Sequence, residues 1–145
     1  MKIDLHSHSF YSDGVLSPSE VVKLASQAGC ELFSLTDHDT TEGSAEAKLE
    51  ADKLNLSLIN GVEISAFWRN MAIHILGLGI DINNDILQTG LEHNQKLRKE
   101  RAEKIALSLW RSGIKDALEK TQSFSKTDML TRTHFAQMLI SEGYC

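Results

Sequence analysis

Apolar and polar positions follow two patterns along the chain. In the first 80 residues, short apolar runs alternate with stretches whose apolar positions recur every three or four residues. The runs predict strands and the stretches predict helices. A repeated strand-then-helix order is typical of an α/β fold with largely parallel strands. The predicted strands cover residues 2–5, 31–36, 56–60, 62–65 and 72–80, and the predicted helices cover residues 18–28 and 42–54.

Local sequence features mark where several helices begin. Ser17, followed three residues later by Glu20, forms the capping-box pattern at the start of the first helix. The pattern changes after residue 83, where helical periodicity runs through residues 84–111. Residues 125–128 resemble another helix start, and Thr133 is the expected cap of a last helix.

Composition and charge narrow the function classes. The chain has 145 residues, enough for one domain, and contains no run of about 18 apolar residues that would span a membrane. Its two cysteines are too few for a disulfide framework, so we expect a cytoplasmic protein. Residues 1–90 carry 5 Lys and Arg against 13 Asp and Glu, a net charge of −8, whereas residues 91–145 carry 10 against 7, a net charge of +3. This split favours a metal site in the first part and an anion contact in the second. Solvated helix faces explain the basic part equally well.

Histidines and carboxylates follow or interrupt the predicted strands at four places. DLHSHSFYSDG (residues 4–14) places His6 and His8 two apart, and therefore on one face of a strand, with Asp13 on the next turn. SLTDHDT (residues 34–40) follows an apolar strand. The strands NGVEISA and AIHILGLGI are interrupted by Glu63 and His74. A carboxylate in an apolar strand needs a partner, because burying it alone is costly.

Each motif also has an ordinary structural explanation. His6 and His8 could be a chance pair, residues 37–40 a helix cap, Glu63 a partner of Arg69 or a lysine, and His74 a core histidine. Together, however, the motifs fall near the ends of separate predicted strands, which converge on one face of a parallel sheet or barrel. We therefore expect two or three divalent ions of manganese, iron or zinc, of the kind that activate water and bind phosphoester oxygens. The candidate ligands are His6, His8, Asp13, His38, Glu63 and His74.

The order DLHSHSFYSDG, TDHDT, GVEIS and HILGLGID resembles the PHP (polymerase and histidinol phosphatase) family, and within it the branch of RNase AM and the 3′,5′-nucleoside bisphosphate phosphatases. The resemblance continues through residues 131–144. It implies an α/β fold in which residues 1–83 form the N-terminal portion of a distorted (β/α)7 barrel and residues 84–145 a helical insertion subdomain. Family members carry two later ligand segments that this sequence lacks, so we expect a barrel truncated before its remaining strands, with an open sheet edge.

The resemblance also implies roles for matching residues. Asp37 and Asp39 would orient ligands through hydrogen bonds, and a metal-activated hydroxide would attack phosphorus. The six ligands would divide among three ions: His6 and His8 on the first, Glu63 bridging to the second, His74 on the second, and Asp13 with His38 on the third.

Basic residues of the second part predict a phosphate site. TRTH (residues 131–134) opens a helix, whose N-terminus favours an anion, and Arg132 can bind a phosphate through two hydrogen bonds. Arg101, with Arg98 one turn away, can reach the same phosphate, and His134 is a weaker candidate. Exposed helix residues without a ligand are the alternative, and His93 is expected to be a surface residue.

These features predict a metal-dependent phosphoesterase. Its substrate would be a phosphomonoester or a 5′-terminal nucleotide phosphodiester, such as a nucleoside 3′,5′-bisphosphate or a short 5′-phosphorylated RNA. Aromatic residues make up only 6% of the chain, which argues against an extended base-stacking platform, and no motif indicates sequence-specific nucleic-acid binding or a membrane partner. The alternatives are a small-metabolite phosphatase of the histidinol-phosphate type and a catalytically inactive metal-binding fragment.

Overall fold

Three short parallel strands organise the N-terminal part of the chain in the computed structural model, which describes residues 1–144. The strands β1 (Ile3–Asp4), β2 (Leu32–Phe33) and β3 (Ser57–Leu58) lie in the order β1-β2-β3. Helix α1 (Pro18–Gln27) connects the first two strands and α2 (Ser44–Lys53) the last two. This is the predicted α/β order.

The two connecting helices bury their apolar sides in one core. The expected capping box is present at α1, where Ser17 Oγ accepts from the Glu20 N–H and the Glu20 carboxylate accepts from the Ser17 N–H. Burying apolar side chains stabilises this part by roughly 25 cal/mol per Å². The core consists of Val22, Ala25, Phe33, Leu35, Ala47, Ala51 and Leu56.

A long antiparallel hairpin follows, which corrects the expectation of largely parallel strands. Strands β4 (Gly61–Trp68) and β5 (Met71–Leu78) pair along their whole length. Arg69 and Asn70 form the two-residue loop, and both have positive φ, as a type I′ turn requires. A loop this short can join only antiparallel strands. Glu63 and His74 were expected near the carboxyl ends of their strands, but Glu63 is the third residue of β4 and His74 the fourth of β5, so this expectation is wrong.

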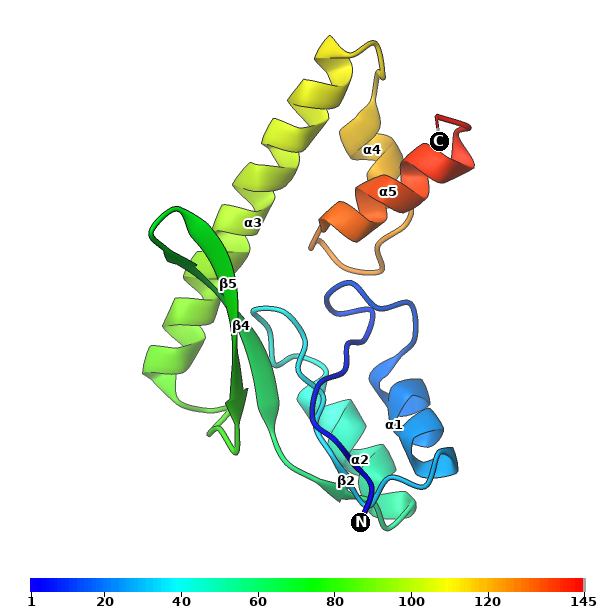
Figure 1. The fold of residues 1–145 in the computed structure, drawn as a ribbon, viewed down its shortest axis with the longest axis vertical. Coiled ribbons are helices and arrows are strands. Elements are labelled where there is room, and N and C mark those ends of the chain that lie inside the picture. Colours follow the sequence, from blue (N-terminus) through cyan, green and yellow to red (C-terminus); the bar gives the residue numbers. More distant parts are fainter. Residues whose placement is uncertain (145) are drawn as a thin grey trace.

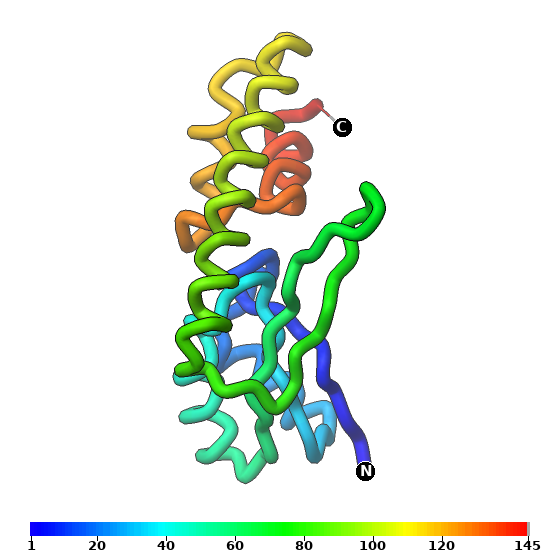
Figure 2. The backbone as a smooth tube through the Cα atoms, turned by 90° about the vertical axis from the view of Figure 1, so that its left-hand side faces the viewer, coloured from blue at the N-terminus to red at the C-terminus, as the bar shows by residue number. Residues whose placement is uncertain are grey.

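The rest of the chain is helical. Helix α3 (Asp85–Arg111) is capped by Asn84 and runs alongside the hairpin (Figures 1 and 2). Helices α4 (Ala117–Gln122) and α5 (Arg132–Ser141) pack against its C-terminal half around Ala102, Phe135 and Met138. Within residues 1–144, no helix has both the length and the apolar character needed to cross a bilayer.

Two expected helix starts in this part are wrong. Thr131, rather than Thr133, caps α5, because its side chain accepts from the His134 N–H. Residues 125–128 begin no helix. Instead, the Ser125 hydroxyl bonds the carbonyl groups of Thr127 and Met129 and closes a turn. This turn is close to the loop after β1, where Lys126 Nζ lies 5.0 Å from the ring centroid of Phe10.

Candidate metal centre

His6 and His8 lie on the extended segment that follows β1, with their ring centroids 5.1 Å apart. Ser7, between them, faces the segment after β2. Its N–H donates to Thr36 Oγ1 and its hydroxyl to the Ser34 carbonyl, both over 3.1 Å. Because successive residues of an extended segment point to opposite sides, this anchoring directs both imidazoles to the other side, as predicted.

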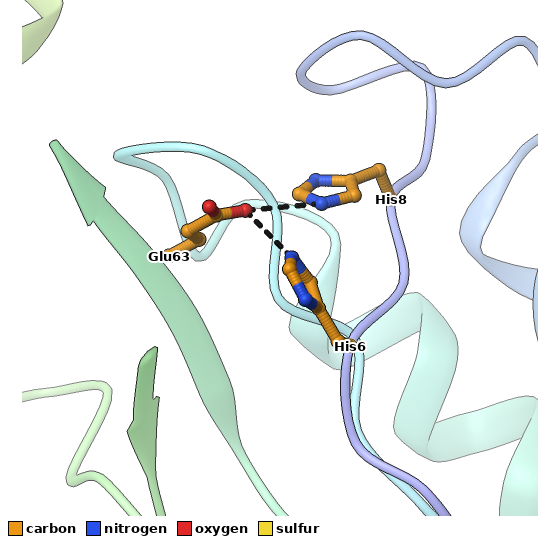
Figure 3. A group of neighbouring side chains, drawn as sticks. All are labelled: His6, His8 and Glu63. Atoms are coloured by element: carbon orange, nitrogen blue, oxygen red, sulfur yellow. Dashed lines mark hydrogen bonds and ion pairs between the residues drawn. The ribbon is translucent and has the colours of Figure 1, made fainter. Parts of the chain in front are cut away.

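Glu63 lies at the centre of the candidate site. Its Oε2 is 2.9 Å from His6 Nε2 and 3.1 Å from His8 Nε2 (Figure 3), and its Oε1 is 2.6 Å from His74 Nδ1. The Glu63 side chain is only 6% exposed, whereas that of His6 is 51% exposed. The central carboxylate is therefore buried, and the site opens to solvent at His6. Burial alone would raise the pKa of Glu63, but hydrogen bonds from His6 and His74 and the charges of His38 and His8 lower it below its ordinary value.

Asp13 and His38 complete the cluster. Asp13 Oδ1 is 3.7 Å from His8 Nδ1, and its Oδ2 is 3.8 Å from His38 Nε2. The site therefore contains three overlapping groups of potential ligands whose donor atoms lie within 4.8 Å of one another. They are His6, His8 and Glu63; His8, Asp13 and His38; and His38, Glu63 and His74.

The chemistry of this donor set fits divalent metal ions. His38 Nδ1 is buried without a hydrogen-bond partner in the described part of the chain, although Glu63 Oε2 is 3.4 Å away in a direction that makes no hydrogen bond. A buried polar atom without a partner is costly, and a metal ion would satisfy it. Burial, together with the charge of Arg98, lowers the pKa of His38 to about 4, so the imidazole is neutral at physiological pH. Neutral imidazole and ionised carboxylate are the forms that bind manganese, iron and zinc.

Asp37 anchors the loop that carries Asp13. It accepts hydrogen bonds from the Ser9 N–H, the Ser9 hydroxyl and the Ser12 hydroxyl over 2.6 to 2.7 Å. Ser12 Oγ in turn lies 3.4 Å from His8 Nδ1. Burial raises the pKa of Asp37, but the three donors favour its ionised form. Ser9 and Ser12 therefore connect this loop to the segment after β2.

Asp39 connects the segment after β2 to the hairpin and to α3. Its N–H donates to the Glu63 carbonyl over 3.0 Å, and its carboxylate accepts from the N–H of Ser65 over 2.8 Å. From α3, it also accepts from Asn94 Nδ2 over 2.9 Å and from Arg98 Nε over 2.6 Å. Asn94 was not anticipated from the sequence, although its spacing of four residues before Arg98 places both on one face of a helix.

A basic cavity of about 410 Å³ adjoins His74. Three arginines that were predicted to bind phosphate line it together with Ser65 and His74. Arg98 is already engaged, because its guanidinium also donates to Ser65 Oγ over 2.6 Å. Arg101 and Arg132 make no hydrogen bond or ion pair to other side chains within residues 1–144. Burial, followed by the charges of Arg98 and Arg132, lowers the pKa of Arg101. Arg98 is neutralised by Asp39, so Arg101 and Arg132 are the two cations of this cavity without an anionic partner in the described residues.

The structure places two histidines outside this cavity. His134, a candidate phosphate contact, is buried inside the start of α5, where its Nδ1 accepts from the Thr131 N–H over 3.2 Å. A side chain enclosed in a helix cap does not line the cavity, which differs from the expectation. His93 is exposed on α3, as expected.

Comparison with known proteins shows the family of the chain. The sequence profile of the PHP domain matches residues 4–138. The chain is 41% identical, over 142 residues, to a 3′,5′-nucleoside bisphosphate phosphatase of Chromobacterium violaceum, covering 97% of this chain and 50% of that protein. It is 42% identical to the 5′-3′ exoribonuclease Rnm of Escherichia coli, covering 97% and 48%. The chain thus spans about half the length of the curated relatives it matches.

Solved structures share the fold. An amidohydrolase from Chromobacterium violaceum, with bound sulfate and no metal, superposes with a TM-score of 0.95 at 40% identity, covering 100% of this chain and 51% of that one. A protein from Bifidobacterium adolescentis classed as a metal-dependent phosphoesterase superposes with a TM-score of 0.88 at 25% identity, with the same coverage.

Proposed function

The chain belongs to the PHP domain family, and from this premise we propose that it provides the metal-binding part of a phosphoesterase. The substrate would be a nucleoside 3′,5′-bisphosphate or the 5′ end of a short phosphorylated RNA. The relatives named as a bisphosphate phosphatase and an exoribonuclease support this substrate class. Because the chain spans about half of their length, the proposal concerns the activity of the protein in which this part is completed.

The observation that carries the proposal is the position of Glu63. One oxygen faces His6 and His8 and the other faces His74, so this carboxylate could bridge two ions. Asp13 and His38 would hold a third ion. Bound ions would activate a water molecule and neutralise the oxygens of the phosphoester.

The protein groups around this centre have separate tasks. Asp37 would keep the loop of residues 9–14 in place, and Asp39 would hold the Glu63 backbone. Arg101 and Arg132 would bind a second phosphate of the substrate, because a guanidinium can donate two parallel hydrogen bonds to phosphate oxygens. Arg98 would position the wall of this cavity rather than bind substrate. Sulfate, the anion held by the structurally similar amidohydrolase, resembles phosphate in charge and shape.

The division into two parts supports this assignment. In the proposed arrangement, residues 1–83 supply all six metal ligands, and residues 84–145 form an inserted helical subdomain that supplies the arginines. The contacts of Asn94 and Arg98 with Asp39 join the two parts beside the site.

The test combines metal content with turnover in the manganese-loaded protein in which this part is completed. The double variant His6→Ala/His8→Ala should lose bound manganese and turnover of adenosine 3′,5′-bisphosphate, whereas His93→Ala, an exposed histidine on α3, should retain both. Wild-type turnover by the double variant would refute the proposal. Turnover of simple monoesters alone would favour the small-metabolite phosphatase, and bound manganese without any turnover would favour the inactive metal-binding fragment.

A further inference from the structure

Phe67 carries an exposed aromatic ring at the edge of the basic cavity beside His74. This cavity is lined by Arg98, Arg101 and Arg132 and is called the arginine cavity below. Phe67 is 78% exposed and lines this cavity as well. The hairpin also exposes Met71 and Ile75, so what distinguishes Phe67 is its position beside the arginines and not its exposure alone. We propose that Phe67 stacks against the base of a nucleotide whose phosphates lie at the metal centre and at the arginines. This inference rests on the proposed function and extends it to recognition of the base.

The register of the hairpin places Phe67 on the same face as the site. Glu63, Ser65 and Phe67 alternate along β4, and alternate residues point to one face. They are paired across the hairpin with Leu76, His74 and Ala72 respectively. Because each pair of residues advances a strand by about 6.6 Å, the Phe67 ring lies at a level about 13 Å beyond Glu63, with the arginine cavity between them.

A nucleoside 3′,5′-bisphosphate has three groups to place. Its sugar carries two phosphates and a flat aromatic base. The metal centre suits one phosphate and the arginine pair suits the other, which leaves the base without a contact. The apolar side of the same cavity, formed by Phe67, Ala72 and Leu97, offers a surface that matches the π-face of a base.

The neighbouring residue provides a matched control. Trp68 is also exposed, at 60%, but it follows Phe67 directly and therefore lies on the opposite face of the hairpin, paired with Met71. The Arg69 guanidinium lies 5.5 Å from its ring centroid, and Trp68 does not line the cavity. If exposed aromatic surface alone mattered, both rings would matter equally.

The experiment compares kcat/KM for two substrates that differ only in the base: deoxyadenosine 3′,5′-bisphosphate and its abasic tetrahydrofuran counterpart. Phe67→Ala should lower kcat/KM for the nucleotide by about 10-fold and leave the abasic substrate nearly unchanged, because base–aromatic stacking contributes only when a base is present. Phe67→Trp, which keeps an aromatic ring, should have nearly the wild-type kcat/KM for the nucleotide. Trp68→Ala should leave kcat/KM unchanged for both substrates.

Four results would overturn the inference. An equal loss on both substrates would indicate a structural role for Phe67. No loss on either, or the same loss in Trp68→Ala, would show that the ring does not contact the base. A change in oligomeric state on sedimentation of Phe67→Ala, with equal loss on both substrates, would identify the hairpin tip as a contact between copies of the chain. By contrast, the absence of turnover of both substrates by the wild type would overturn the proposed function itself.

Discussion

Arg98 Nε donates a hydrogen bond of 2.6 Å to Asp39 Oδ2, and both side chains are almost completely buried, at 7% and 0% exposure. This ion pair joins α3 to the segment that also fixes the Glu63 backbone. Burying a charge is tolerable only while its partner is present. The contact between the helical part and the candidate site therefore depends on a pair in which neither member can be removed alone.

Replacing Arg98 should destabilise the fold. In Arg98→Met, the Asp39 carboxylate loses its charged partner, so the free energy of unfolding should fall by about 3–5 kcal/mol, measured by urea denaturation. The control is Lys99→Met, whose ion pair with Asp128 is exposed and 3.8 Å long and should contribute less than about 1 kcal/mol. Equal losses in the two variants would contradict this expectation.

Replacing Glu63 by glutamine should weaken metal binding. The amide keeps the shape of the side chain but removes the charge that faces four imidazoles, so manganese affinity by calorimetry should fall by at least about 10-fold. Glu92→Gln changes an exposed carboxylate on α3 and should bind manganese as the wild type does. Unchanged affinity in Glu63→Gln would place the ions elsewhere.

The metal-free chain should become less stable as the pH falls below about 6.5, the ordinary pKa of histidine. In the fold, the pKa of His38 is lowered to about 4. Between these values the unfolded chain binds a proton that the folded chain does not, so the free energy of unfolding decreases with falling pH, by at most about 1.4 kcal/mol per pH unit. Urea denaturation from neutral pH to about pH 4.5 should show a shallower decrease in His38→Gln, and identical pH dependences would exclude this cause.

Substrate binding by the arginines can be separated from chemistry at the metal centre. Arg101→Gln should lower kcat/KM for adenosine 3′,5′-bisphosphate by at least about 10-fold, because a hydrogen bond to a charged group contributes about 1.5–3 kcal/mol. Turnover of adenosine 3′-monophosphate, which carries the reacting phosphate but lacks the second, 5′ phosphate, should be much less affected. Lys104→Gln, an exposed cation one turn further along α3, is the control, and a loss of equal size there would indicate only a general effect of charge.

Two glycines should respond to alanine with opposite signs. A Cβ at Gly61 would collide with the Ser34 hydroxyl and approach Thr36 Cγ2 to 2.8 Å, so Gly61→Ala should lower the free energy of unfolding by about 1–3 kcal/mol. A Cβ at Gly90, within α3, would meet no atom within 4 Å. Gly90→Ala should therefore raise the free energy of unfolding by roughly 0.5–1 kcal/mol. Thermal or urea denaturation of both variants checks the pair, and destabilisation by Gly90→Ala would contradict the described packing of α3.

The sequence allowed the candidate ligands to be predicted because each motif is local. The spacing of His6 and His8, and the polar residues after β2, follow from strand periodicity alone. The direction of β5 did not follow, because Arg69-Asn70 lacks the glycine that normally marks a type I′ turn. The expectation that Glu63 and His74 lie at parallel strand ends was therefore wrong, although the antiparallel register still brings both to the site.

Contacts between distant segments were the least predictable. Nothing near Asp39 in the sequence indicates that Asn94 and Arg98 bind it, because pairing across more than 50 residues depends on where α3 packs. For the same reason, the burial of Arg98 could not be anticipated. The cap contact between His134 and Thr131 is local, three residues apart, and was missed because the cap was expected at Thr133. Phe67 could have been noticed only as an aromatic residue two positions after Ser65 on the same strand.

The hydrogen bond from Ser12 to Asp37 determines which nitrogen of His8 carries hydrogen. A neutral imidazole has one nitrogen that carries hydrogen and one that offers a lone pair. Because Ser12 Oγ donates to Asp37, it can only accept from His8, which places the hydrogen on Nδ1 and the lone pair on Nε2, toward Glu63. The tautomer of His8 is therefore set from a different segment of the chain, so a displaced loop would change which nitrogen is able to bind an ion.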